Sequence, residues 1–297
     1  MTNYRPIPRP SFEAALSKVP AVTLLFWVIK VLATTLGETG GDAVTMSMLH
    51  ADTNAENGGY LIGTGIFLVI FVAAVIAQIA TKKFYSWIYW FAIAASTTVG
   101  TTMADFFDRS IGIGYTGGTT ILLICVLASL ALWHFTLGSV NVETVASPKV
   151  EIFYWVTITF SQTLGTALGD WMADDTGLGY AGGALVFGGA LVILAALYYR
   201  TSVSRVLLFW AAFILTRPLG ATVGDFLDKP VNHGGLSFSR PLASLVILVL
   251  IVALVLIIPN GPATILSSSA PSFARADIPA VPRILITKAR SSRPHRA

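Results

Sequence analysis

Eight long apolar runs constrain the fold of this chain more than any other feature of its sequence. Each run has about 20 residues, enough for a helix to cross a hydrocarbon core about 30 Å thick. The runs lie near residues 20–42, 60–80, 84–105, 113–137, 152–170, 179–199, 203–225 and 241–258. Only 11% of the residues are charged, against about 25% in soluble domains. Because lipid offers no partner to free backbone groups, the runs predict an all-α polytopic membrane protein with about eight transmembrane helices.

The runs divide the chain into three regions. Residues 1–18 are predicted to be an N-terminal segment, residues 19–258 the membrane domain, and residues 259–297 a disordered basic tail, since the tail is rich in Pro, Ser and Arg. Most of the 19 lysines and arginines fall in the two termini and in the connections after the second, fourth and sixth runs. The positive-inside rule therefore places both termini in the cytoplasm.

The membrane domain is built from a fourfold internal repeat. Four tryptophans are each followed by glycine ten residues later and by aspartate fifteen residues later. The tryptophans are Trp27, Trp90, Trp155 and Trp210, and the aspartates are Asp42, Asp105, Asp170 and Asp225. The register predicts four parallel two-helix repeats, at about 19–80, 84–137, 150–199 and 203–258. A small residue four positions after each glycine favours close helix packing, so we expect the first helix of each repeat at the centre and the second outside.

Oxygen-bearing side chains share the helix face of the repeat aspartates. Glu38, Thr101 and Thr166 precede them by four residues, and Thr98 and Thr163 precede them by seven. Asp108, Asp174 and Asp228 follow by three or four residues, which predicts an acidic mouth on the non-cytoplasmic side. Carboxylates and hydroxyls suit a hard cation such as Mg²⁺, Ca²⁺ or Mn²⁺. The predicted metal ligands are Glu38, Asp42, Asp105, Asp170, Asp225, Thr98, Thr101, Thr163, Thr166, Asp108, Asp174 and Asp228.

Three further charged residues need an interpretation. Arg217 occupies the position where the other repeats have Thr34, Thr97 and Gln162. Arg217 is either an internal counter-ion that competes with a cation for Asp225 or one half of a buried structural ion pair. Lys30 is expected to extend towards the cytoplasmic interface, and Glu151 is expected to be a solvated loop charge.

These features favour a secondary transporter of a hard cation, with Mn²⁺ or Ca²⁺ preferred. Several close acids cannot all be ionised, so cation binding is expected to be coupled to protons. The expected partners are the metal cation, the proton and the lipid bilayer, with no cofactor beyond the transported ion. Spans this apolar do not fit nucleic-acid binding, and the oligomeric state stays open.

Three other functions stay as alternatives. One is a monovalent cation carrier or channel, and another is a non-transporting membrane scaffold. The third is an intramembrane metal-dependent enzyme, because phospholipid-synthesising alcohol phosphatidyltransferases also repeat aspartates at helix ends. Their compact Asp-x-x-Asp-Gly-x-x-Ala-Arg motif is only begun in "DFFDRSIG" and "DFLDKPVN", so the chain is expected not to be an enzyme.

The repeated segments "LGETGGD", "VGTTMAD", "LGTALGD" and "LGATVGD" carry a family resemblance. Over about residues 15–258 the sequence resembles bacterial integral membrane proteins usually labelled uncharacterised membrane-anchored proteins. This resemblance implies a location in the bacterial inner membrane. "GETGGD" also resembles the Glu-x-Gly-Asp signature of calcium and manganese/proton exchangers, with an extra glycine and without the following base. The second resemblance implies a divalent substrate.

Overall fold

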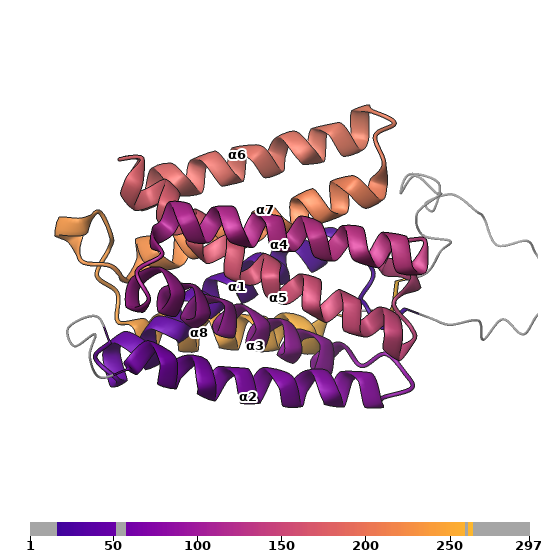
Figure 1. Cartoon of the computed structure of the whole chain (residues 1–297), viewed down its shortest axis with the longest axis horizontal. Coiled ribbons are helices and arrows are strands. Elements are labelled where there is room, and N and C mark those ends of the chain that lie inside the picture. Colours follow the sequence, from indigo (N-terminus) through magenta and orange to yellow (C-terminus); the bar gives the residue numbers. More distant parts are fainter. Residues whose placement is uncertain (1–16, 52–57, 259–260, 264–297) are drawn as a thin grey trace, which may run out of the picture. The chain divides into compact units, whose positions relative to one another are not determined.

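The computed structural model describes residues 17–51, 58–258 and 261–263, so most of the two predicted terminal regions lies outside the described residues. The described chain is helical, with eight α-helices (Figure 1). They are α1 (Leu24–Asp42), α2 (Gly59–Ala80), α3 (Ser86–Asp105), α4 (Gly114–Leu137), α5 (Pro148–Asp170), α6 (Gly179–Arg200), α7 (Arg205–Asp228) and α8 (Arg240–Ile257). Short π-helical segments follow α1, α3 and α5 directly: η1 (Ala43–Met48), η3 (Phe106–Ser110) and η5 (Trp171–Asp175).

Local sequence signals set several of the helix ends. The hydroxyl of Thr23 accepts a hydrogen bond from the backbone N–H of Phe26, and that of Ser204 accepts one from Leu207, so both residues cap free N–H groups of a first turn. Pro148 begins α5, where its missing N–H costs nothing. The chain leaves α4 through Gly138, whose φ of 78° lies in the left-handed region that favours glycine.

Helices α1, α3, α5 and α7 form a closed ring in which each helix packs against two neighbours. At each crossing a repeat glycine faces a side chain of the next ring helix, and an added Cβ would come within 2.9 Å of that residue. The facing pairs are Gly37 with Thr97, Gly100 with Gln162, Gly165 with Arg217 and Gly220 with Thr34. The last pair joins α7 back to α1, so four copies of one glycine contact close the ring. Neighbouring ring helices run parallel, since Gly37 faces Thr97 and Gly41 faces Thr101 at the same offset.

The even-numbered helices lie outside the ring, and each covers the ring helix of the following repeat. Helix α2 packs on α3, α4 on α5, α6 on α7, and α8 returns to α1 (Figure 1). Large apolar side chains such as Val69, Ile124 and Leu185 point outward, with exposed fractions of 71%, 62% and 78%. An apolar belt of this kind matches lipid as the solvent.

Among the helices that the structure describes, five are long and apolar enough to cross a membrane: α2, α4, α6, α7 and α8. The sequence predicted about eight such spans. Helices α1, α3 and α5 fall short by composition because they carry hydroxyl, amide and charged side chains on the face that lines the ring.

The two ends of the ring differ in chemistry, and we name them the tryptophan end and the aspartate end after the repeat residues found there. At the tryptophan end, the hydroxyls of Tyr89 and Tyr154 lie 2.6 Å apart inside an aromatic cluster. Residues 17–21 and 261–263 also pack there, where the ammonium of Lys18 lies 2.6 Å from Oε1 of Glu151. Glu151 is fully buried, so the prediction of a solvated loop charge is wrong.

Candidate metal centre

Polar side chains form successive layers inside the ring. In the layer nearest the tryptophan end, Nζ of Lys30 lies 3.5 Å from Oε1 of Gln162 and 4.2 Å from the ring centroid of Phe213. The amide of Gln162 donates in turn to the hydroxyl of Ser96. Lys30 is fully buried, so it does not reach an interface as predicted. Ring closure explains the difference, because the side chain points to the axis of the ring rather than along its outer surface.

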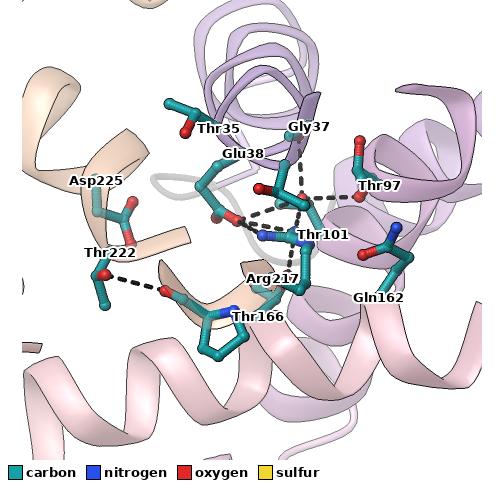
Figure 2. A network of polar contacts seen from close by, with 12 residues as sticks. Thr35, Gly37, Glu38, Thr97, Thr101, Gln162, Thr166, Arg217, Thr222 and Asp225 are labelled. Atoms are coloured by element: carbon teal, nitrogen blue, oxygen red, sulfur yellow. Dashed lines mark hydrogen bonds and ion pairs between the residues drawn. The ribbon is translucent and has the colours of Figure 1, made fainter. Parts of the chain in front are cut away.

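Arg217 dominates the next layer (Figure 2). Its two terminal nitrogens each lie 3.0 Å from Oε2 of Glu38. Nη2 also donates to the hydroxyls of Thr101 and Thr166. The guanidinium therefore contacts all three other ring helices. Gly165 makes room for its stem, since a Cβ there would lie 2.1 Å from Cγ of Arg217.

The geometry of Arg217 bears on the two interpretations of this residue that the sequence left open. Arg217 is fully buried in an ion pair with Glu38, whereas the counter-ion interpretation had named Asp225. Three of the predicted cation ligands, Glu38, Thr101 and Thr166, thus meet around Arg217. The positive charge that these three residues contact in this structure is the guanidinium of Arg217.

The four repeat aspartates form the layer at the aspartate end, and each is 3% exposed or less. Two basic side chains bridge them in pairs. Nε of Arg109 lies 2.8 Å from Asp105, and Nη2 of the same residue lies 3.4 Å from Asp170. The ammonium of Lys229 lies 2.7 Å from Asp42 and 3.0 Å from Asp225. Each base therefore joins the aspartate of its own helix to that of the next ring helix.

The hydroxyl stripe predicted from the sequence is only partly assembled. Thr101 and Thr166 reach Arg217, whereas Thr98 and Thr163 donate to carbonyls of their own helices, those of Ala94 and Thr159. A threonine hydroxyl commonly bonds the carbonyl four residues earlier, and here that local bond is made instead of a contact with the carboxylates.

The expected acidic mouth is also not formed by all three of its predicted residues. Asp174 is exposed, but Asp108 and Asp228 are each only 6% exposed. Asp108 lies against α4, where a Cβ on Gly118 would be 2.0 Å from Oδ1. Burial raises the pKa of Asp108 to about 6, although the neighbouring Arg109 lowers it. The side chains of Asp108 and Asp228 therefore lie within the packed aspartate end of the ring rather than in solvent.

Two groups of three carboxylates converge closely enough to share one cation. Oxygens of Glu38, Asp170 and Asp225 lie within 4.8 Å of one another, and oxygens of Asp42, Asp225 and Asp228 do the same. We call these the inner triad and the outer triad, because Glu38 lies one turn deeper in the ring than Asp225. The hard oxygen donors suit Mg²⁺, Ca²⁺ or Mn²⁺.

Comparison with protein families identifies the repeat. The family described as a repeat of unknown function, DUF347, matches the chain four times, at residues 25–84, 88–139, 153–204 and 208–258. The chain belongs to this family. The four matches confirm the predicted duplication, and each DUF347 repeat supplies one ring helix and one outer helix. No curated protein and no solved structure matches the chain.

The DUF347 repeats are not equivalent in charge. Arg109 and Lys229 both stand nineteen residues after the repeat tryptophan, in the second and fourth repeats, where the first and third have Met46 and Asp174. The aspartate layer thus has approximate twofold symmetry within the fourfold ring. Sequence reasoning missed both bases, although the signal was available: each lies four residues after its repeat aspartate, on the same helix face.

Proposed function

We propose that this chain is a carrier of a hard cation, with Mn²⁺ or Ca²⁺ preferred, which it exchanges for protons. The observation that carries the proposal is the inner triad, where oxygens of Glu38, Asp170 and Asp225 converge within 4.8 Å. Three different ring helices supply these oxygens. A cation stripped of water needs several oxygen ligands, and the ring brings them together away from bulk water.

The balance of buried charge supports the binding of cations or protons. Seven buried acids line the aspartate end, and four bases contact them. The acids are Glu38, Asp42, Asp105, Asp108, Asp170, Asp225 and Asp228, and the bases are Arg109, Arg217, Lys229 and Arg240. Ionised carboxylates without a partner are costly in a low-dielectric interior. The acids in excess therefore favour uptake of protons or of a metal cation, and competition between the two would couple their movements.

Arg217 favours a carrier over a channel. Its fully buried guanidinium occupies the axis of the ring between the inner triad and the tryptophan end. A continuous ion path through the axis would require its displacement. A carrier needs access to its site from one side at a time. The tryptophan end is packed with aromatic side chains, whereas at the aspartate end the side chain of Arg109 is 31% exposed, which supports access from the aspartate end.

The proposed setting is the bacterial inner membrane, crossed by all eight helices. The apolar outer belt supports this, since α2, α4, α6 and α8 surround the three less apolar ring helices. The cationic connections at the tryptophan end, among them Lys82, Lys83 and Arg200, favour a cytoplasmic location for that end.

Transport by reconstituted vesicles tests the proposal, with Mn²⁺ uptake and proton release measured together. Asp170→Asn should reduce Mn²⁺ flux by about tenfold or more, the effect of losing a charged ligand. Asp175→Asn is the matched control, because Asp175 is an exposed acid of the same repeat that is not among the predicted ligands, and its flux should match that of the wild type. Equal flux in both variants, or no Mn²⁺-dependent proton movement in the wild type, would reject this function in favour of a monovalent carrier or a scaffold.

A further inference from the structure

Asp228 is a buried carboxylate that accepts no hydrogen bond from the described residues, a property it shares with Asp108. Its side chain is fully buried at the end of α7, yet neither of its oxygens accepts a hydrogen bond from any residue that the structure describes. The nearest base is Arg240 of α8, whose Nε lies 3.7 Å from Oδ2. Buried polar atoms in native proteins nearly always have hydrogen-bond partners. An oxygen of Asp228 without such a partner lies within 4.8 Å of oxygens of Asp42 and Asp225, which points to a missing ligand.

The ammonium of Lys229 lies among the same carboxylates. It contacts Oδ2 of Asp42 at 2.7 Å and Oδ1 of Asp225 at 3.0 Å, and it is 3.7 Å from the sulfur of Met46. A lysine ammonium is a compact, strongly hydrated point charge, close in its electrostatics to a small metal cation. Lys229 therefore contacts two of the three carboxylates of the outer triad and offsets one of their negative charges.

We propose that Asp42, Asp225 and Asp228 form a second site for a hard cation, and that Lys229 is its built-in competitor. An arriving cation takes the place of the ammonium at the outer triad before it moves one helical turn deeper to Glu38. This inference rests on the proposed function, because the two triads share Asp225. The class of ligand is a divalent cation with a preference for oxygen donors.

The backbone around Lys229 allows its side chain to leave without unfolding the helix. Lys229 is the first residue after α7, with an extended backbone (φ −68°, ψ 152°). Its N–H donates to the carbonyl of Asp225, and its carbonyl accepts from Ser237, so the main chain stays anchored. Only the flexible four-carbon stem must swing towards the aspartate end, where the side chain is already 11% exposed.

Arg109 provides an internal comparison. It is the counterpart of Lys229 two repeats earlier and bridges Asp105 and Asp170 in the same way. Its neighbouring acid, Asp108, does not converge with that pair but lies against Gly118 of α4. The competitor role is therefore specific to Lys229, and Arg109 serves as the matched control.

The inference is tested by measuring Mn²⁺ binding to the full chain in detergent. Binding is monitored as the loss of the electron paramagnetic resonance signal of free Mn²⁺. Lys229→Gln should tighten Mn²⁺ binding by about tenfold or more, because the competing charge is gone. Adding Asp228→Asn to Lys229→Gln should cancel that gain. In the control, any change caused by Arg109→Gln should be unaffected by Asp228→Asn. A gain from Lys229→Gln that persists without the Asp228 carboxylate would overturn the second site.

A measurement on the wild type covers the case in which Lys229→Gln does not fold. Labelling of Lys229 by an amine-reactive reagent, quantified by mass spectrometry, should increase when Mn²⁺ is added, because the amine loses its carboxylate partners. Labelling of the exposed Lys82 and Lys83 should not change. Unchanged labelling of Lys229 at saturating Mn²⁺ would contradict the displacement.

The results also separate this inference from the proposed function. An Asp228-dependent gain in Mn²⁺ binding without any vesicle flux would keep the outer site and reject transport. Flux that depends on Asp170, combined with a gain that is independent of Asp228, would keep transport and reject the outer site. Absence of Mn²⁺ binding in every variant would reject both.

Discussion

The guanidinium of Arg217 lies on the axis of the four-helix ring, with both terminal nitrogens 3.0 Å from Oε2 of Glu38 (Figure 2). Glu38, Thr101 and Thr166 were predicted to be cation ligands of the first three repeats. They surround the guanidinium group that Arg217 contributes from the fourth repeat. In that fourth repeat Ala221 replaces the oxygen-bearing residue, and Arg217 approaches from one turn earlier. The same chemistry that suits a metal ion here stabilises a side chain.

We expect Arg217→Met to destabilise the protein strongly. The change would leave the buried Glu38 carboxylate without its partner, and breaking one side of a buried ion pair costs about 3–5 kcal/mol. The double variant Arg217→Met/Glu38→Gln should recover most of the loss, because no buried charge is then left unpaired. Thermal unfolding of the purified protein in detergent measures both. If the destabilisation of the double variant equalled the sum of those caused by Arg217→Met and Glu38→Gln alone, the two residues would not be coupled.

Two glycines of α1 should respond in opposite ways to alanine. A Cβ on Gly37 would lie 2.3 Å from Oγ1 of Thr97, at a ring crossing, so Gly37→Ala should cost about 2 kcal/mol or more. For Gly40, one turn away, the nearest atoms to a new Cβ are 3.9 Å distant. Gly40→Ala should be neutral or stabilise by up to about 1 kcal/mol through helix propensity. Equal unfolding temperatures for the two variants would argue against the closed ring.

Asp108 should make stability depend on pH. Burial raises the pKa of Asp108 to about 6, above the usual range of an aspartate, so the folded state binds the proton more tightly than the unfolded state. The contribution of Asp108 to the free energy of unfolding is therefore most favourable below about pH 4. This contribution, about 2–3 kcal/mol in total, is lost as the pH rises through about 6. Asp108→Asn should remove this dependence and be more stable than the wild type above pH 7. Unfolding curves from pH 4 to pH 8 measure the difference.

Asp174→Asn serves as the control for this pH experiment. Because Asp174 is an exposed acid at the same end of the ring, its variant should follow the wild-type curve across the whole range. A wild-type curve that Asp108→Asn leaves unchanged would show that the carboxyl titrates alike in the folded and unfolded states.

The sequence by itself determined the helices, the duplication and the location of the polar residues. Apolar run length is set by the thickness of a bilayer, and the register of Trp27 with Gly37 and Asp42 recurs in all four repeats. Glycine at a fixed interval predicted close helix packing at the centre, and the structure has all four glycines at ring crossings.

Only the tertiary structure decided which charges meet. Arg217 and Glu38 are 179 residues apart in sequence, and Lys229 and Asp42 are 187 apart, so no local period connects them. The contacts depend on closure of the ring from α7 to α1, which brings the first and fourth repeats side by side. The direction of a side chain also depends on packing: from the sequence Lys30 was predicted to reach the interface and Glu151 to be a solvated loop charge, but both are buried. Periodicity fixes the face of a helix on which a residue lies, whereas the neighbour opposite that face is fixed only when the helices are assembled.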